Sequence, residues 1–233
     1  MNSVRTGPRY EVKIPLPASF LSGLRMDIRL HPAHWRTAYP PRQVNNLYFD
    51  TPDYRNLSAT LEGHAERIKP RLRWYGPDSS RPRAVRFELK RKTGHVGWKE
   101  IYRVDGEFDL NATSWPALYR ELKGALEPRA RLWLERFGRP ALINHYQRAY
   151  YETPDGAIRL TLDTDIRAYD QHRGFAFNLT SPAYTEPTLV LELKSGREQA
   201  ARLARILGRF GPRVDRFSKY VQGMLGDPAP YWM

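Results

Sequence analysis

The chain has 233 residues, with 38 Lys and Arg against 25 Asp and Glu, so its formal net charge is +13. Hydrophobic residues make up 41 % of the sequence, which is enough for a folded core and excludes a disordered basic tail. There is no cysteine, and this excludes disulfide scaffolds, cysteine-ligated zinc, cysteine nucleophiles and iron–sulfur clusters.

Helices and strands are predicted along the whole chain. Strands are expected where apolar and charged residues alternate with a period of two, and helices where apolar residues recur every three or four positions. In chain order we expect a strand over 9–14, a helix over 17–30, a strand over 44–50, a helix over 51–62, strands over 69–75, 85–92 and 98–104, a helix over 114–126, strands over 146–150, 158–163 and 189–194, and helices over 197–210 and 218–225.

The chain contains no signal for a domain boundary. Neither an internal repeat nor a long linker is present, so we expect a single domain over 1–233, with 1–8 and 227–233 as tails. Residues 1–8 hold no apolar segment of the kind found in signal peptides, and no run approaches the roughly 18 apolar residues of a membrane span. We therefore expect a cytoplasmic protein without a transmembrane segment.

The excess positive charge lies mainly on predicted strands. Between Arg67 and Arg103 there are 12 basic and 3 acidic residues. In the predicted strand 85–92, aliphatic and aromatic residues fall on one face and charged residues on the other. Like charges that face each other across strands repel, so such a face is unfavourable unless an anion neutralises it.

Two folds are compatible with this alternation. A β-sandwich would place the charged faces in solvent. A closed antiparallel β-barrel would turn them into its lumen and leave an apolar exterior for helices to cover. Because Arg and Lys dominate these faces over Ser, Thr and Glu, we favour the barrel, an α+β fold with flanking helices.

The charge predicts an anionic partner with several negative groups. One Arg–phosphate pair at about 4 Å is worth about 4 kcal/mol before desolvation at an effective dielectric constant of about 20. The planar guanidinium group binds two phosphate oxygens at once. A tri- or polyphosphate could neutralise several converging cations, whereas a single carboxylate could not. No GxxxxGK[ST] loop is present, which argues against a P-loop NTPase.

Seven short motifs in a fixed order point to a known family. They are Arg9-x-Glu11-x-Lys13, Leu47-Tyr48-Phe49-Asp50-Thr51-Pro52, Leu61-Glu62-Gly63, Arg71-Leu72-Arg73-Trp74-Tyr75-Gly76, Glu88-Leu89-Lys90-Arg91-Lys92, Leu191-Glu192-Leu193-Lys194 and Phe217-Ser218-Lys219-Tyr220. In this order and spacing the chain resembles the VTC domain, the polyphosphate-polymerase domain of the vacuolar transporter chaperone complex, in its stand-alone prokaryotic form. VTC domains are triphosphate tunnel metalloenzymes, related to CYTH domains.

The resemblance implies a tunnel of about eight antiparallel strands that closes as a barrel. It also implies transfer of the γ-phosphate of ATP to a growing inorganic polyphosphate chain, so the expected partners are ATP and polyphosphate, with no specific nucleic acid. The catalytic positions carried over by motif are Lys13, Arg71, Arg73, Lys90 and Lys99. The positions expected to bind substrate are Arg9, Arg148, Arg159, Lys194, Ser218 and Lys219.

The resemblance further implies a Mn²⁺ or Mg²⁺ cofactor. Glu192 corresponds to the metal ligand, with Glu11 and Glu88 as secondary candidates. The E-x-E-x-K opening of CYTH domains is here Arg9-x-Glu11-x-Lys13, as in VTC domains, so one metal-binding glutamate is absent.

Other functions are compatible with the same residues. The tunnel could hydrolyse tripolyphosphate or a nucleoside triphosphate, with water in place of the acceptor. The chain could also be a non-catalytic module that binds polyphosphate or nucleic acid. At the level of single residues, Glu88 with Lys90 and Glu192 with Lys194 could be ordinary cross-strand ion pairs worth less than about 1 kcal/mol each.

Overall fold

The computed structural model describes residues 4–5, 7, 9–94, 96–172, 174–183, 188–211 and 217–226. Its strands are β1 (Val4–Arg5), β2 (Tyr10–Pro17), β3 (Arg36–Asp50), β4 (Glu66–Tyr75), β5 (Val85–Thr93), β6 (Val96–Val104), β7 (Arg139–Glu152), β8 (Ile158–Asp170) and β9 (Thr188–Ser195). Its helices are α1 (Leu21–Leu30), α2 (Arg55–Leu61), α3 (Trp115–Ala125), α4 (Pro128–Arg136), α5 (Ala200–Phe210) and α6 (Lys219–Leu225), with 3₁₀ turns at Ala18–Phe20 and Arg197–Gln199.

Among the described residues, no helix combines the length and apolar character needed to cross a membrane. The predicted tail 227–233 lies outside the described residues.

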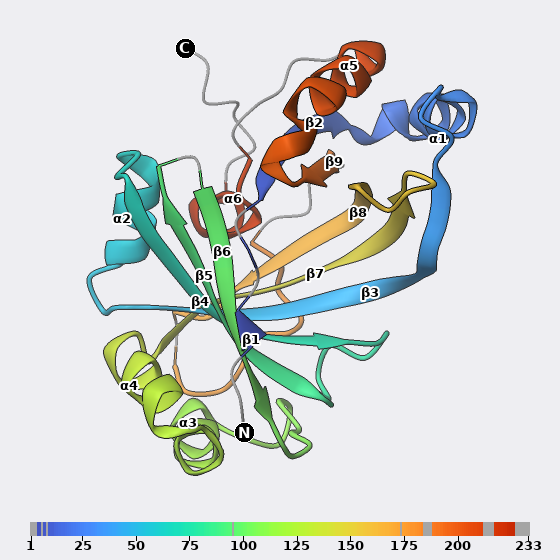
Figure 1. Ribbon diagram of the computed structural model, residues 1–233. Coiled ribbons are helices and arrows are strands. Elements are labelled where there is room, and N and C mark those ends of the chain that lie inside the picture. Colours follow the sequence, from blue (N-terminus) through green and yellow to red (C-terminus); the bar gives the residue numbers. More distant parts are fainter. Residues whose placement is uncertain are drawn as a thin grey trace.

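The strands form one antiparallel sheet in the order β1-β6-β5-β4-β3-β7-β8-β9-β2 (Figure 1). β5 and β2 are six strands apart in this order, which would separate them by about 29 Å in a flat sheet. The Nζ atom of Lys90 on β5 nevertheless lies 2.9 Å from Oε1 of Glu11 on β2. The sheet is therefore strongly curled, and these two strands face each other across its concave side.

The curled sheet approaches a barrel, but the predicted closure is not confirmed. Val4 and Arg5 of β1 pair with Ile101 and Glu100 on the free edge of β6. Among the described residues, a single bridge from Arg9 to Gly97 continues along this edge. β2 then pairs along its whole length with β9 instead of β6. Val4 and Arg5, which we expected to be part of a tail, thus occupy the edge where a closed barrel would need β2.

Helices cover the convex, apolar face of the sheet in two groups (Figure 1). Leu122 of α3 and Leu134 of α4 belong to the same buried cluster as Trp74 and Phe87 of the sheet. Leu24 and Ile28 of α1, with Leu203 and Ile206 of α5, pack in a second buried cluster with the outer residues of β2, β8 and β9. The apolar exterior and the flanking helices of the barrel prediction are confirmed, whereas the β-sandwich alternative is wrong because there is one sheet.

α6 packs against the concave side and fills one end of it (Figure 1). Tyr220 and Val221 join a third apolar cluster with inward-facing sheet residues such as Tyr48, Leu142 and Ala168. Gly223 allows this close approach, because a Cβ atom there would lie 2.5 Å from Cδ2 of Leu142 and 2.7 Å from Cβ of Ala168.

Two elements differ from the prediction for identifiable reasons. β3 begins at Arg36 and not at Val44, because register shifts on either side of Tyr39 allow the strand to pass the proline pair 40–41. α4 was not predicted; it has a proline in its first turn and begins two residues after the C-cap of α3 at Leu126.

α2 begins at Arg55, four residues later than the predicted start at Thr51. The carboxylate of Asp50, which is fully buried, accepts hydrogen bonds from the backbone N–H groups of Asn56 (2.9 Å) and Leu57 (3.1 Å). Asp50 also accepts a hydrogen bond of 2.5 Å from the hydroxyl of Tyr220. The same side chain therefore caps α2 and fixes α6 to the end of β3.

We expect Gly223→Ala to destabilise the protein. The added methyl group overpacks the contact between α6 and the sheet at a cost of about 1–3 kcal/mol. For a chain of this size each kcal/mol corresponds to about 2–4 °C in Tm. The matched control is Gly208→Ala on the exposed face of α5, where nothing lies within 4 Å of the new Cβ; this change should stabilise by up to about 1 kcal/mol. Thermal unfolding followed by circular dichroism measures the Tm of both variants. Tm shifts of the same sign would contradict the close packing of α6 against the sheet at Gly223.

Candidate functional site

Charged side chains gather on the concave side of the sheet. On β4, Arg71 and Arg73 point inward, whereas the alternating residues Leu72 and Trp74 join the outer core. Among the described residues, nine cations and four carboxylates meet there, and we call them the charged network: Lys13, Lys69, Arg71, Arg73, Lys90, Lys99, Arg148, Lys194 and Lys219, with Glu11, Glu88, Asp163 and Glu192. Its cations exceed its carboxylates by five.

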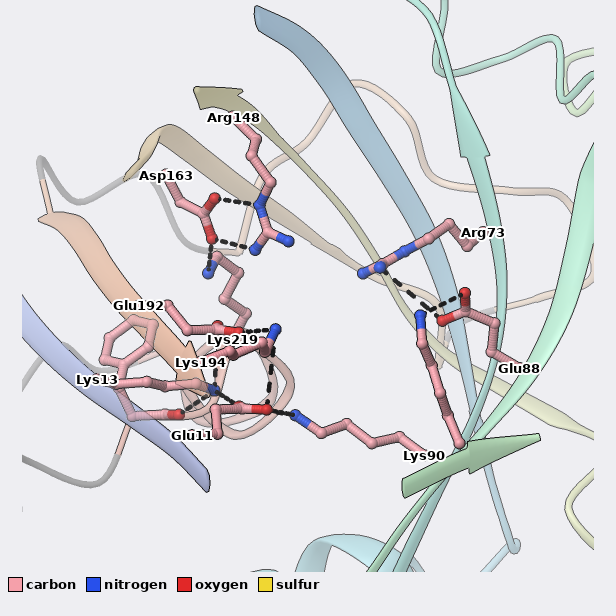
Figure 2. A network of polar contacts seen from close by, with 12 residues as sticks. Glu11, Lys13, Arg73, Glu88, Lys90, Arg148, Asp163, Glu192, Lys194 and Lys219 are labelled. Carbon is pink, nitrogen blue, oxygen red and sulfur yellow. Dashed lines mark hydrogen bonds and ion pairs between the residues drawn. The ribbon is translucent and has the colours of Figure 1, made fainter. Parts of the chain in front are cut away.

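Glu88 is the centre of the first group of contacts (Figure 2). The guanidinium group of Arg71 donates to Oε2 of Glu88 from Nε (3.0 Å) and Nη2 (2.6 Å). Arg73 and Lys99 lie 3.9 and 3.3 Å from the same carboxylate. Burial opposes ionisation, but these three cations outweigh it and hold the pKa of Glu88 below its usual range. Glu88 is thus an ionised partner of arginine, and not of Lys90.

Glu11 and Glu192 form the second group, on the adjacent strands β2 and β9. The Nζ atom of Lys13 lies 3.2 Å from Glu11 and 3.9 Å from Glu192. Lys194 forms ion pairs with the same two carboxylates, and Lys90 reaches Glu11 from the opposite wall. Burial acts to raise the pKa of each carboxyl group, yet the surrounding ammonium groups keep both pKa values below the usual range. Two ionised carboxylates therefore share two ammonium groups.

Asp163 is the centre of the third group and was not predicted as a site residue. It is fully buried on β8, where Arg148 of β7 donates to both its oxygens, at 2.5 and 2.7 Å. Lys219, the first residue of α6, donates to Oδ2 at 2.5 Å. Although burial disfavours the ionised form, both cations hold the pKa of Asp163 below its ordinary value.

The start of α6 is attached to the charged network by consecutive residues. Lys13 donates to the carbonyl oxygen of Phe217 (3.0 Å), and Lys69 donates to Oγ of Ser218 (2.9 Å). Ser218 also caps α6, since its Oγ accepts from the backbone N–H of Val221. The predicted substrate positions Ser218 and Lys219 thus lie where the helix meets the network.

The structure brings together most of the predicted residues but places two of them apart. The predicted catalytic residues, together with Arg148, Lys194 and Lys219, belong to the charged network. Arg9 and Arg159 are exposed and line a pocket of about 220 Å³, which Lys194 and Glu198 also border. They lie at a mouth of the network, next to Lys194, and not within its buried part.

Several polar residues that the sequence motifs did not identify complete the network. Lys69 shares the inward alternation of Arg71 and Arg73, so the pattern on β4 could have revealed it. The Arg73 guanidinium donates to Oδ1 of Asn46 (2.8 Å) and to the hydroxyl of Tyr146 (3.2 Å). Nothing local in the sequence identifies these last partners, because the pairing of strands β3, β4 and β7 brings them together.

The donor set near Glu192 is suitable for a divalent metal ion only in combination with a substrate. The described residues contain no group of three His, Cys, Asp or Glu side chains placed to hold a metal. Glu11 and Glu192 offer hard oxygen ligands in one place, whereas Glu88 is engaged by arginine elsewhere in the network. Mg²⁺ commonly binds through one or two carboxylates together with phosphate oxygens and water, so Glu11 and Glu192 fit that pattern.

We expect Asp163→Asn to destabilise the ligand-free protein strongly. Removing one partner leaves Arg148 and Lys219 buried without compensation, which costs about 3–5 kcal/mol. Added tripolyphosphate should recover part of the lost Tm, because it supplies the missing negative charge.

The matched control for this prediction is Asp53→Asn. Asp53 pairs with Arg55 at 2.8 Å, but both side chains are more than half exposed, so the loss of stability should be far smaller than that of Asp163→Asn. Chemical denaturation in urea, with and without tripolyphosphate, measures both variants. Equal losses for the two would contradict the central role of Asp163.

We expect the affinity for tripolyphosphate in metal-free buffer to fall as pH rises above about 8. Burial lowers the pKa of both Lys90 and Lys99 to about 8, and lowers that of Lys69 well below its ordinary value. A bound anion favours the charged ammonium form of these lysines. Between pH 8 and the ordinary lysine pKa of about 10.4, the lysines must therefore take up protons when the anion binds, and this weakens binding as the pH rises.

Calorimetry in buffers of different ionisation enthalpy measures this proton uptake together with the dissociation constant. The variant Lys123→Gln, which removes an exposed lysine of α3, should keep the pH dependence of the parent protein. An affinity that stays constant between pH 7 and pH 10 would refute the prediction.

Comparisons with known proteins agree with this architecture. The family model described as the VTC domain matches residues 10–226. A search of curated proteins found no match.

Two solved structures found by comparison with this chain are HpAC1 and the PH1819 protein. HpAC1 from Hippeastrum, described as having a dominant triphosphatase activity, has a TM-score of 0.52 and 16 % identity, and the alignment covers 97 % of this chain and 98 % of HpAC1. The PH1819 protein from Pyrococcus horikoshii OT3 has a TM-score of 0.41 and 14 % identity, with 90 % of this chain and 94 % of that chain covered. The match to the family model spans the strands that carry the charged network, and the chain belongs to the VTC domain family.

Proposed function

We propose that this protein is a polyphosphate polymerase that transfers the γ-phosphate of ATP to a growing chain of inorganic polyphosphate. The observation that carries the proposal is the excess of five cations in the charged network, on the buried inner face of a VTC-family sheet. Such an excess suits a ligand with several negative charges. It is unfavourable in the absence of one.

The network supports catalysis by positioning and by neutralising charge. Phosphoryl transfer depends mainly on these two effects. An oxygen of the acceptor's terminal phosphate forms a bond to the γ-phosphorus, while the bond between that phosphorus and the β,γ-bridging oxygen breaks and ADP leaves. The cations assigned to the β- and γ-phosphates are Lys13, Arg71, Arg73, Lys90 and Lys99.

The acceptor chain would follow the remaining cations. Arg148, Lys194 and Lys219 extend the network from the β- and γ-phosphate positions, and Ser218 adds a hydroxyl group. Arg9 and Arg159 border the pocket at the mouth next to Lys194, where a lengthening polyanion would meet further positive charge.

Mn²⁺ or Mg²⁺, when bound, would supply additional positive charge to the phosphate oxygens, and Glu192 and Glu11 are the residues that would hold it. Their ionised state, maintained by Lys13 and Lys194, is the form that binds a cation.

Hydrolysis is the second candidate function, since the structurally similar HpAC1 is described as a triphosphatase. One feature of the network favours transfer over hydrolysis. Each of its four carboxylates is ion-paired with at least two cations and has a lowered pKa, so none is suited to accept a proton from water. A phosphate acceptor is already anionic and needs no such base.

A non-catalytic role in binding nucleic acid has less support. Arg71, Arg73 and Arg148 are buried, and a duplex, whose phosphates lie on a wide outer surface, would not reach them.

We expect purified protein with ATP and Mn²⁺ to produce long-chain polyphosphate, resolved by gel electrophoresis. Glu192→Gln and Lys90→Ala should each lower the rate by at least about 100-fold, the typical effect of removing a charge-stabilising group. Lys123→Ala, on an exposed face of α3, should leave the rate unchanged.

The products distinguish the candidate functions. Release of short phosphates without polymer would identify a triphosphatase. Full activity of both network variants would refute the site assignment, and no turnover with any metal would leave only a binding role.

A further inference from the structure

Three tyrosines surround one arginine at the end of β3 that lies away from α6. The guanidinium carbon of Arg42 lies 4.3 Å from the ring centroid of Tyr75, 5.0 Å from that of Tyr150 and 5.8 Å from that of Tyr39. Nε of Arg42 donates to the hydroxyl of Tyr150 at 3.2 Å. The rings of Tyr39 and Tyr150 meet edge to face, with centroids 5.8 Å apart. We call these four residues the tyrosine cluster.

The register of the sheet connects the tyrosine cluster to the charged network. Tyr39 pairs with Tyr150, Tyr150 with Thr161, and Thr161 with Glu192. Directly paired residues of an antiparallel sheet project from the same face, so this row lies on the concave side. From Tyr150 to Glu192 there are two strand spacings, or about 10 Å. The cluster is therefore a near neighbour of the candidate metal ligand.

Thr161, in the middle of this row, has an unused hydroxyl group. Its Oγ1 atom is buried and has no hydrogen-bond partner among the described residues. A buried hydroxyl without a partner costs free energy, so a ligand that reaches the row would gain by bonding to it.

Two residues of the tyrosine cluster are exposed to solvent, whereas a cluster that only stabilised the fold could be buried. Tyr39 is 53 % exposed, and Arg42 is exposed and forms no ion pair with any described residue. The register shifts around Tyr39 and Arg42 orient both side chains locally, as irregularities next to binding sites often do. The result is an aromatic and cationic surface, accessible from solvent, at the edge of the charged network.

We propose that the tyrosine cluster is the nucleoside subsite of this protein. The base stacks on Tyr39 and Arg42, and the ribose bonds to the hydroxyl of Thr161, while the phosphates enter the charged network. This inference rests on the proposed function, because it requires a nucleoside triphosphate in that network. Stacking uses the flat face of the base, which every base offers. We therefore expect the protein to bind nucleotides more tightly than tripolyphosphate, but to discriminate little between ATP and GTP.

The test compares two ligands on the same variants of the full chain. Dissociation constants for ATP and for tripolyphosphate are measured by calorimetry in metal-free buffer. Tyr39→Ala should weaken ATP binding about 10-fold, within the range for loss of one stacking partner, and leave tripolyphosphate binding unchanged. Tyr39→Phe should retain the affinity for ATP. Thr161→Val, which keeps the shape of the side chain, should weaken ATP binding only.

Phe175→Ala is the matched control, because Phe175 is an exposed aromatic residue that borders a different pocket, with Trp115 and Arg139. It should change neither constant. Equal weakening of both ligands by Tyr39→Ala, or no weakening at all, would overturn the nucleoside subsite. If the parent protein bound neither ligand, the proposed function would fail and the subsite with it; if the parent bound both equally well, the subsite alone would fail.

Discussion

Mutual repulsion among nine inward-facing cations is the constraint that the rest of this structure must meet. The four carboxylates meet it by linking neighbouring strands, and Glu11 and Asp163 also link segments that are distant in the sequence. Glu11 joins β2 to β5 and β9, Glu88 joins β5 to β4 and β6, and Asp163 joins β8 to β7 and α6. The carboxylates hold the cations in position before a ligand arrives, and such pre-organisation lowers the cost of binding. Because they neutralise fewer than half of the positive charges, a strong attraction for polyanions remains.

The sequence is informative where one strand contains the whole signal. Alternation along β4 and β5 is sufficient to assign Arg71, Arg73 and Lys90 to one face, and the structure places them on the concave side. The flanking helices other than α4 follow from equally local patterns. The motif order added the family, which the match over residues 10–226 confirms.

Local patterns of this kind do not predict contacts between segments that are distant in the sequence. Asp163 belongs to an alternating segment, but its role depends on the register of β7 with β8, which contains an irregularity between His145 and Gln147. Closure of the barrel depends on whether β1 or β2 pairs with the edge of β6, and a two-residue strand leaves no periodic signal. The first part of β3 was missed because two prolines interrupt a strand pattern that the sheet accommodates by shifting register.

The attachment of α6 has a consequence for how the protein is made. Lys13 lies near the beginning of the chain and Lys219 near its end, yet both contact the same network, and the hydroxyl of Tyr220 bonds to Asp50. During translation, every strand of the sheet precedes α6, so the sheet would emerge without the helix that completes the arrangement of its charges. The binding face is complete only after residue 220 has left the ribosome, so an unfinished chain would carry the inward-facing charges of the sheet without the helix that packs against them.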